Sequence, residues 1–309
     1  MRKWFEKPGR WAALYTILLT GAFVFSLLDA FVIPKSLKQA ETLSSSVPET
    51  SSSRPTESTS SDPAEWTDNS YKDEDISITI ETVRRSDTTL YVADIQLSSI
   101  DYLKAALADD TYGRNIKATT SQQAQTKKAI FAVNGDYYGF RDDGFVLRNG
   151  VLYRDGARSS TDDQALVIDE DGNFSIVHES STTAESLKNE GAWQVFSFGP
   201  ALVENGEIAV STSTEVGKAM TSNPRTAIGQ VSSLHYIVIV SDGRTEESAG
   251  LSLYELAQEF ADRGCETAYN LDGGGSSTMY FNGKVVNNPA NGRGSKEREV
   301  SDIVYIGRE

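Results

Sequence analysis

The polar and apolar residues of this chain divide it into three parts. A mostly apolar run occupies residues 11–33, and Asp29 is its only charged residue. Serine, threonine and proline then dominate residues 35–75, where large apolar residues are few. From there on, short strand-like runs alternate with turn dipeptides. The pattern predicts a cytoplasmic tail and transmembrane anchor at 1–34, a disordered linker at 35–75 and one folded domain at 76–309.

The apolar run is long enough to cross a bilayer. At ~1.5 Å per residue, residues 11–33 span the ~30 Å of hydrocarbon. Four basic residues precede it, namely Arg2, Lys3, Lys7 and Arg10. Such a basic flank stays on the cytoplasmic side. A cleaved signal peptide is the alternative, but the end of the run is a poor small-x-small cleavage site. We therefore expect a signal-anchor: a single-pass membrane protein whose C-terminal domain is extracellular.

The linker composition has a direct physical meaning. A chain rich in serine, threonine and proline cannot bury enough apolar surface to offset its conformational entropy. Residues 35–75 are therefore expected to form a flexible stalk that holds the domain away from the membrane.

The domain is predicted to be β-rich with few helices. Four strand pairs flank a dipeptide that tolerates positive φ angles: Asn149-Gly150, Asp171-Gly172, Asn205-Gly206 and Asn282-Gly283. Such dipeptides favour the turns of β-hairpins. Ser252 and Glu255 have the spacing of a helix capping box, and Gly264 can end that helix. A second helix is expected at 99–107. The fold class is α/β, in the α+β sense.

The most informative segment is the run Asn-Leu-Asp-Gly-Gly-Gly-Ser-Ser-Thr at 270–278. Three glycines are unfavourable inside a strand or helix, but they suit a loop whose bare backbone lets a ligand approach. Asp272, at the mouth of this loop, could act as an acid, a base or a hydrogen-bonding group. A plain turn between two strands is the alternative interpretation.

Three other segments share this design, in which a strand runs out into polar residues. They are Asn-Gly-Asp-Tyr-Tyr at 134–138, Asn-Pro-Arg-Thr at 223–226 and Ser-Asp-Gly-Arg at 241–244. Strand ends are where rigid scaffolds present catalytic groups. Together the four segments supply acids and arginines, a set that suits a reaction on a sugar phosphate.

The candidate site residues follow from this reading. Asp136, Asp242 and Asp272 are the catalytic candidates, because glycosidic cleavage uses two carboxylates. Arg225 and Arg244 could hold phosphate oxygens through paired hydrogen bonds. The other candidates for substrate contact are Asn134, Gly273, Gly274, Gly275, Ser276 and Ser277. A surface ion pair for each arginine and a turn cap for each aspartate are the ordinary alternatives.

Composition excludes several classes of partner and site. The 309-residue chain has a net charge of −15, which argues against nucleic acid as a partner. The single cysteine, Cys265, allows no intrachain disulfide and is expected to be a small core residue. An exported domain without disulfides suggests a bacterial protein, which we interpret as Gram-positive. Two histidines without a motif argue against a zinc site or a serine triad. The sequence identifies no cofactor. Its clustered carboxylates leave a divalent cation (Ca²⁺ or Mg²⁺) possible, although they do not have the spacing of an EF-hand.

The four segments occur in the order 134–138, 223–227, 241–244 and 270–278, and Arg-Glu-Val-Ser-Asp-Ile-Val closes the chain at 298–304. Together they resemble the phosphodiester glycosidase family, which includes a lysosomal enzyme and bacterial exported proteins associated with exopolysaccharide biosynthesis. The resemblance covers most of the domain. It implies an α/β fold with a mixed sheet, a sugar-1-phosphodiester substrate and an active site near Asp272.

The leading hypothesis is a membrane-anchored extracellular hydrolase that cleaves the glycosidic bond of a sugar-1-phosphodiester in a cell-envelope glycan or its intermediate. Two alternatives use the same loops. One is a non-hydrolytic protein that binds exopolysaccharide during assembly, and the other is a glycosyl or phosphoglycosyl transferase. The sequence leaves the oligomeric state open.

Overall fold

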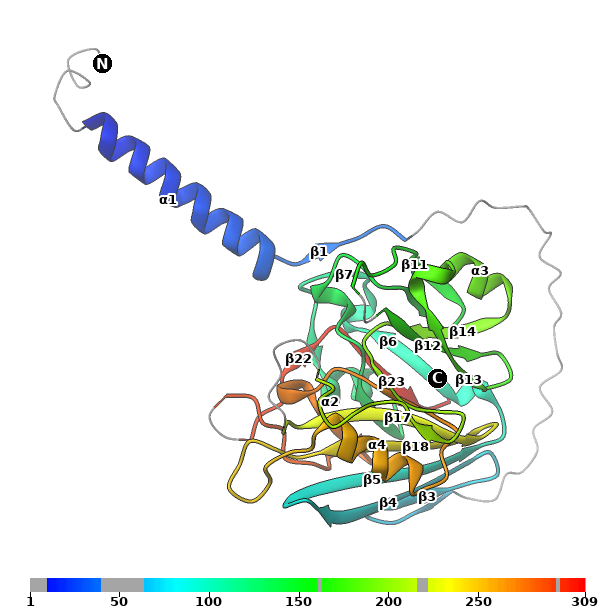
Figure 1. The fold of residues 1–309 in the computed structure, drawn as a ribbon. Helices are drawn as coiled ribbons and strands as arrows, with labels where there is room; N and C mark the ends of the chain where they lie inside the picture. Colours follow the sequence, from blue (N-terminus) through cyan, green and yellow to red (C-terminus); the bar gives the residue numbers. More distant parts are fainter. Residues whose placement is uncertain (1–9, 40–63, 161–162, 216–221, 293–294, 309) are drawn as a thin grey trace.

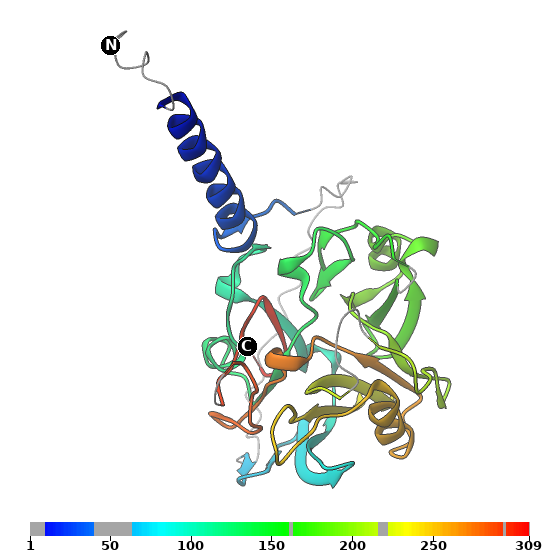
Figure 2. The same ribbon diagram turned by 60° about the vertical axis from the view of Figure 1, so that its left-hand side comes forward.

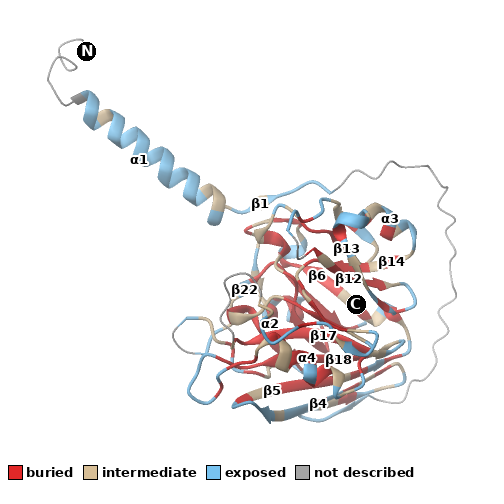
Figure 3. Cartoon of the chain, viewed as in Figure 1, coloured by how far each residue is buried: buried red, intermediate tan, exposed pale blue. Residues whose placement is uncertain are grey.

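The computed structural model describes residues 10–39, 64–160, 163–215, 222–292 and 295–308. An apolar helix, α1 (Arg10–Phe31), projects from a β-rich body (Figures 1 and 2). Its segment Trp11–Phe31 has the length and composition of a membrane span, which a signal sequence can also have. Side chains along this helix are mostly exposed, whereas the strands of the body are largely buried (Figure 3).

The largest sheet has nine strands. Across the sheet they are β16 (Glu207–Ile208), β15 (Ala201–Glu204), β19 (Thr267–Asn270), β17 (Arg225–Ser232), β18 (His235–Ser241), β5 (Thr88–Leu97), β4 (Ile76–Arg85), β3 (Ser70–Lys72) and β2 (Glu65–Trp66).

Two five-stranded sheets and two short ribbons complete the body. The first sheet runs β21 (Lys284–Val285), β20 (Met279–Phe281), β9 (Phe131–Asn134), β23 (Asp302–Ile306) and β6 (Leu103–Leu107). The second runs β11 (Val151–Arg154), β10 (Val146–Arg148), β14 (Ala192–Phe196), β12 (Gln164–Asp169) and β13 (Phe174–His178). The ribbons pair β1 (Lys35–Ser36) with β7 (Gly113–Arg114), and β22 (Glu299–Val300) with β8 (Ala118–Thr119).

One apolar core lies between the three large sheets, since strands of all three contribute to it. Each sheet also buries its outer face against a short helix. α4 (Leu253–Ala261) packs on the nine-stranded sheet, α2 (Thr120–Thr126) on the β9 sheet and α3 (Ala184–Asn189) on the β14 sheet. In the described part of the chain, single 3₁₀ turns join strands at η2 (Ile100–Tyr102), η3 (Ala108–Asp110), η4 (Tyr138–Phe140), η5 (Glu179–Ser181) and η6 (Gly274–Ser276).

The β-rich class with few helices is confirmed. The family resemblance implied a mixed sheet, but all ladders between the described strands are antiparallel. The strand–helix–strand unit β18–α4–β19 does contain two parallel strands, but they are not neighbours. Both of its strands flank β17 and pair antiparallel with it, so they run in the same direction without touching.

Local turn and cap chemistry was predicted correctly. Asn149-Gly150, Asn205-Gly206 and Asn282-Gly283 each join two paired strands with positive φ at both positions. The β12–β13 hairpin turns through Asp171-Gly172. Ser252 and Glu255 form the expected reciprocal cap of α4.

Two predictions about local structure are wrong. The expected helix at 99–107 is η2 followed by β6, because this segment pairs with β23 at the far end of the chain. Residues 65–75, assigned to the linker, instead contribute β2 and β3 to the nine-stranded sheet. Residues 35–36 form β1 against β7. Within the linker, residues 40–63 lie outside the described part of the chain.

Close packing between β17 and α4 gives a stability prediction. A Cβ on Gly229 would lie 2.7 Å from Phe260 Cδ1 and 3.1 Å from Cys265 Sγ, both in the core. Gly229→Ala should therefore destabilise the domain by ~1–3 kcal/mol through overpacking, measured by urea denaturation. Gly156→Ala is the matched control, since a Cβ there meets nothing within 4 Å. Equal stability of the two variants would contradict this packing.

Candidate active site

The glycine-rich loop carries the chain from one sheet to another. β19 ends at Asn270 in the nine-stranded sheet, and β20 begins at Met279 beside β9. Between them, η6 makes a single turn. The loop therefore lies where two sheets meet, at the ends of strands from both of them.

The buried side chain of Asn134, the last residue of β9, fixes this loop. Its Nδ2 donates to the carbonyl oxygen of Asp272 at 2.6 Å. Its Oδ1 accepts from Thr226 Oγ1 at 2.9 Å and from the backbone N–H of Thr278 at 3.3 Å. These partners come from β17 and from both ends of the loop. The structure thus places the Asn134 side chain behind the loop, which it holds in position. Contact of Asn134 with substrate stays a prediction.

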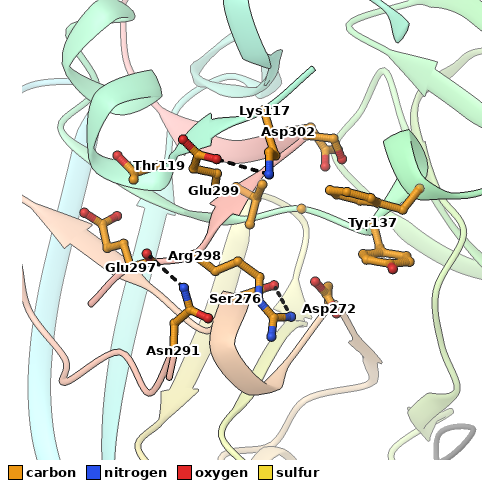
Figure 4. Close-up of a pocket in the computed structure, with 14 residues that line it drawn as sticks. Lys117, Thr119, Tyr137, Asp272, Ser276, Asn291, Glu297, Arg298, Glu299 and Asp302 are labelled. Atoms are coloured by element: carbon orange, nitrogen blue, oxygen red, sulfur yellow. Dashed lines mark hydrogen bonds and ion pairs between the residues drawn. The ribbon is translucent and has the colours of Figure 1, made fainter. Parts of the chain in front are cut away.

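Two cavities adjoin the loop and share part of their walls. The larger has a volume of about 630 Å³, and its walls include Tyr137 and Ser276. The smaller has a volume of about 200 Å³ and is lined by Gly273–Gly275. Asp272 and Arg298 line both cavities. Figure 4 shows Arg298, Ser276 and Asp272 grouped together in the larger one.

Two arginines lie against the glycines, which explains why this loop needs bare backbone. A Cβ on Gly274 would lie 3.0 Å from Arg244 Nη2, and φ at this glycine is +62°. A Cβ on Gly275 would lie 2.8 Å from Arg298 Nη2. Any side chain at these positions would push a guanidinium away from the loop.

Arg225 completes a cationic lining of the smaller cavity. It is buried, its Nε donates to Leu251 O at 2.9 Å, and its Nη2 lies 3.5 Å from Glu215 Oε2. Burial lowers the pKa of its guanidinium, Glu215 opposes this, and the charge of Arg244 lowers the pKa further. A cavity lined by three guanidinium groups and one carboxylate favours an anionic ligand.

Asp272 is half-buried between the cavities. Burial raises the pKa of its carboxyl above the usual value. The hydrogen bond from Ser276 and the positive charges of Arg298 and Arg141 act in the opposite direction. A carboxyl with a raised pKa in a cavity marks a candidate functional site.

A buried charge cluster lies behind the larger cavity. Arg148 Nη2 is 2.9 Å from Asp136 Oδ1 and 2.9 Å from Asp302 Oδ2. All three side chains are buried. Asp136 also accepts from the backbone N–H of Ser197 at 2.8 Å. One guanidinium faces two carboxyl groups, so a surplus negative charge is buried unless one carboxyl holds a proton.

Asp302 is the member of this cluster that reaches the cavity. It lines the larger cavity, and its Oδ1 is buried without a hydrogen-bond partner among the described residues. Burial and the charge of Asp136 raise the pKa of Asp302 to about 7, although Arg148 opposes them. The N–H of Gly135 donates to Asp302 O at 2.9 Å, and the carbonyl oxygen of Gly135 accepts from Asp272 N at 3.2 Å. The backbone of Gly135 therefore links Asp272 to Asp302.

The structure brings most of the predicted residues together: Asp272, Gly273, Gly274, Gly275, Ser276, Arg225 and Arg244 all line one of the two cavities. Four others line neither cavity: Asp136, Asp242, Asn134 and Ser277. Asp242 accepts from the backbone N–H and the side-chain amide of Asn288 at 2.8 and 3.1 Å, and from Tyr91 at 3.3 Å. It holds the 287–288 segment in place.

Sequence reasoning missed Arg298, Asp302 and Tyr137 as site residues. Arg298 and Asp302 belong to the closing block at 298–304, whose β23 returns the chain to β9. Tyr137 has a positive φ of 74°, an uncommon conformation for a tyrosine that turns the chain after β9. Among the described residues, no group of three or more His, Cys, Asp or Glu side chains is arranged to hold a metal ion.

The fold and the site define a mostly β domain with a carboxylate between a cationic and a larger polar cavity. Comparison with known proteins gives the family. The family model described as phosphodiester glycosidase matches residues 127–307, more than half of the chain. The chain belongs to the phosphodiester glycosidase family.

Individual relatives are consistent with this assignment. The uncharacterized prophage-derived protein YomE of Bacillus subtilis is 33% identical over 200 residues, covering 63% of this chain and 30% of that protein. Human N-acetylglucosamine-1-phosphodiester alpha-N-acetylglucosaminidase is 28% identical over 207 residues, covering 62% and 40%. The chain thus spans less than half the length of the curated relatives it matches.

Solved structures share the fold. The catalytic domain of the zebrafish N-acetylglucosamine-1-phosphodiester alpha-N-acetylglucosaminidase, auto-inhibited by its pro-peptide, aligns with a TM-score of 0.59 at 19% identity, covering 90% of this chain and 89% of that one. A hypothetical protein from Synechocystis aligns with a TM-score of 0.58 at 15% identity, covering 75% and 62%.

The contact between Gly275 and Arg298 can be tested directly. Gly275→Ala places a methyl group 2.8 Å from Arg298 Nη2, the mobile end of a long side chain. We expect the guanidinium to move while the melting temperature changes little, and substrate affinity to fall about tenfold, the equivalent of ~1.4 kcal/mol. Gly156→Ala, where a Cβ meets nothing within 4 Å, controls for loss of a glycine. Unchanged affinity in Gly275→Ala would contradict a role for this contact.

The raised pKa of Asp302 predicts a pH dependence of stability. Between about pH 4 and pH 7 the folded state holds this proton more tightly than the unfolded chain, so stability falls as pH rises through this window. Asp302→Asn lacks this loss. Its melting temperature minus that of the wild type should therefore become more positive from pH 4.5 to 7.5, measured by calorimetry.

The control for this measurement is Asp101→Asn, which removes one exposed carboxyl outside the buried cluster. If the Asp302→Asn difference rose no more with pH than that of this control, the carboxyl of Asp302 would be ionised in the folded state throughout.

Proposed function

We propose that this protein is a membrane-anchored phosphodiester glycosidase that hydrolyses the glycosidic bond of a sugar-1-phosphodiester in an extracellular cell-envelope glycan or its intermediate. One observation carries the proposal: Asp272 and Arg298 line both an arginine-rich cavity and a larger polar cavity. A glycosyl phosphodiester has the matching polarity, with an anionic phosphate on one side of the scissile bond and a sugar on the other.

The smaller cavity suits the phosphate. Arg225, Arg244 and Arg298 approach it from different segments, and the three glycines leave room for the phosphate oxygens. Guanidinium groups bind phosphate through paired, charge-assisted hydrogen bonds. A volume of about 200 Å³ admits a phosphate and the first atoms of the group esterified to it.

The larger cavity suits the sugar. Its walls carry the aromatic rings of Tyr137 and Phe140, together with polar groups such as Asn291 and Ser276. Aromatic rings offer flat apolar surface to the C–H face of a sugar, while polar side chains can bond its hydroxyl groups.

The proposed mechanism depends on the nature of the leaving group, which is a phosphate. Cleavage breaks the bond between C1 of the sugar and the bridging phosphate oxygen, and the phosphate departs as a monoester. The guanidinium groups stabilise the charge that develops on this oxygen, so protonation of the leaving group matters less than it does for a sugar hydroxyl. As the phosphate leaves, Asp272 acts in one of two ways: as the nucleophile, forming a glycosyl-aspartate that water then hydrolyses, or as the base that takes a proton from the water attacking C1.

Asp302 is the candidate for the second carboxyl group. It lines the larger cavity with Asp272, is joined to it through Gly135, and holds a proton more tightly than an ordinary aspartate. Glycosidic cleavage commonly divides proton transfer and attack between two carboxyl groups of unequal pKa. This assignment replaces Asp136 and Asp242, which lie outside both cavities.

Asp272→Asn tests the proposal. The change keeps the shape and hydrogen bonding of the side chain but removes its ionisable group, so the turnover number should fall by about 10²–10⁴ with little change in circular dichroism. The full-length protein in detergent would be assayed with the methyl ester of N-acetylglucosamine-1-phosphate, following the released monoester by phosphorus NMR. Asp101→Asn serves as the control.

Near wild-type turnover by folded Asp272→Asn would remove the residue from the chemistry. Tight binding of the ester by the wild type without release of monoester would favour the binding protein over the hydrolase. Transfer of the sugar to an added alcohol in preference to water would favour the transferase.

A further inference from the structure

The end of the anchor helix contacts the domain directly. The described residues of α1 are mostly exposed, and the chain beyond it turns onto the body of the protein within four residues (Figures 1 and 2). Lys35 pairs with Arg114 and Ser36 with Gly113, which forms the β1–β7 ribbon. The backbone N–H of Leu37 continues the contact by donating to Tyr112 O at 2.9 Å.

Side chains reinforce this ribbon on the helix side. Asn115 Nδ2 donates to the carbonyl oxygens of Ala30 and Ile33, both at 3.2 Å. Carbonyls in the last turn of a helix lack partners within that helix, so a buried side chain of the domain caps the anchor. Lys35 Nζ also returns to Asp29 Oδ2 at 2.6 Å, which folds the connection back on the last helical turn.

Gly113 shows that the approach is close. A Cβ at this position would overlap the carbonyl group of Lys35, so β1 lies on bare backbone. The domain side of the ribbon is itself held to the rest of the protein, because Arg114 pairs with Asp142 at 2.7 Å and Asn115 N donates to Gly139 O at 3.3 Å. Gly139 belongs to η4, which follows Tyr137 and includes Phe140 on the wall of the larger cavity.

Chain geometry then limits how far the cavity can lie from the bilayer. Lys35 is four chain steps beyond Phe31, and Lys117, which lines the larger cavity, is three steps beyond Arg114. At most ~3.6 Å per residue, with about 5 Å across the ribbon, Lys117 lies within about 30 Å of the end of the anchor helix. A free stalk over residues 36–64 could instead extend about 100 Å.

We propose that β1 clamps the domain to the end of its membrane anchor, so that the active site works at the membrane surface on a glycosyl phosphodiester carried by a lipid in the same bilayer. The substrate part of this inference rests on the proposed function. The Ser-rich segment then joins two fixed points of the same domain, β1 and β2, and does not set the reach of the site.

Cross-linking tests the clamp without any substrate. Lys35 and Arg114 are opposite each other in the ribbon, so Lys35→Cys/Arg114→Cys should form a disulfide on mild oxidation of membranes that contain the full-length protein. The control is Lys35→Cys/Asp87→Cys, because Asp87 is exposed in the β4–β5 hairpin, on the other side of the body from β1 in Figure 1. The native Cys265 is buried.

We expect the first pair to be cross-linked almost completely and the control pair to stay reduced. Equal cross-linking of both pairs, or none in the first pair when each single thiol reacts with an impermeant maleimide, would overturn the clamp. A mature chain whose intact mass lacks the residues before 35 would overturn it as well.

A vesicle assay tests the substrate class. The protein is placed in phosphatidylcholine–phosphatidylglycerol vesicles. N-acetylglucosamine-1-phosphate esterified to dihexadecylglycerol, whose two chains keep it in its bilayer, is placed in the same vesicles or in separate ones. We expect hydrolysis in the same vesicles at least tenfold faster than in separate ones, and the same ratio for the cross-linked Lys35→Cys/Arg114→Cys protein. Equal rates in both arrangements would overturn the proposal. If the soluble methyl ester is not hydrolysed at all, the proposed glycosidase function fails, whereas the cross-linking result still decides the clamp.

Discussion

One buried amide holds the functional part of this fold in place. Asn134 ends β9 in one sheet and bonds to Thr226 in another, and between them it fixes both ends of the glycine-rich loop. An asparagine suits this place because its side chain offers a donor and an acceptor to backbone and hydroxyl groups that would otherwise be buried without partners. The position of Asp272, and with it the boundary between the two cavities, depends on this contact. These hydrogen bonds fix the conformation of the loop even though it consists largely of glycine.

Electrostatic imbalance gives the site its character. The nine-stranded sheet brings guanidinium groups to one side of the loop, whereas the cluster around Arg148 leaves a surplus carboxyl on the other. Each arrangement is unfavourable by itself, because groups of like charge lie close together in a partly buried environment. A ligand that carries negative charge on one side and accepts a proton or hydrogen bond on the other would relieve both. The charge distribution of the two cavities therefore complements a ligand that is anionic at one end and polar at the other.

The sequence predicts what is local and misses what is assembled from a distance. Turns at Asn149-Gly150 and the cap at Ser252 depend on the conformational freedom and hydrogen bonding of adjacent residues, so they could be read directly. The segment at 103–107 could not, because its partner β23 lies near the other end of the chain. The same holds in the site. Asp272 is marked by its glycines, whereas Asp302 gains its role only from Arg148 and Asp136, which no local pattern connects to it.

The segment between β1 and β2 has a consequence for how this protein can vary. Both of its ends are held by strand pairing, and its composition predicts no packed structure of its own, so we expect its length to enter the stability of the fold through the entropy of closing a loop. That entropy grows logarithmically, and doubling the length adds only ~0.6 kcal/mol. Insertions, deletions and changes of composition there should be nearly neutral for folding. This stretch is therefore the natural place to introduce an epitope, a fluorophore or a second domain while leaving α1 and the two cavities undisturbed.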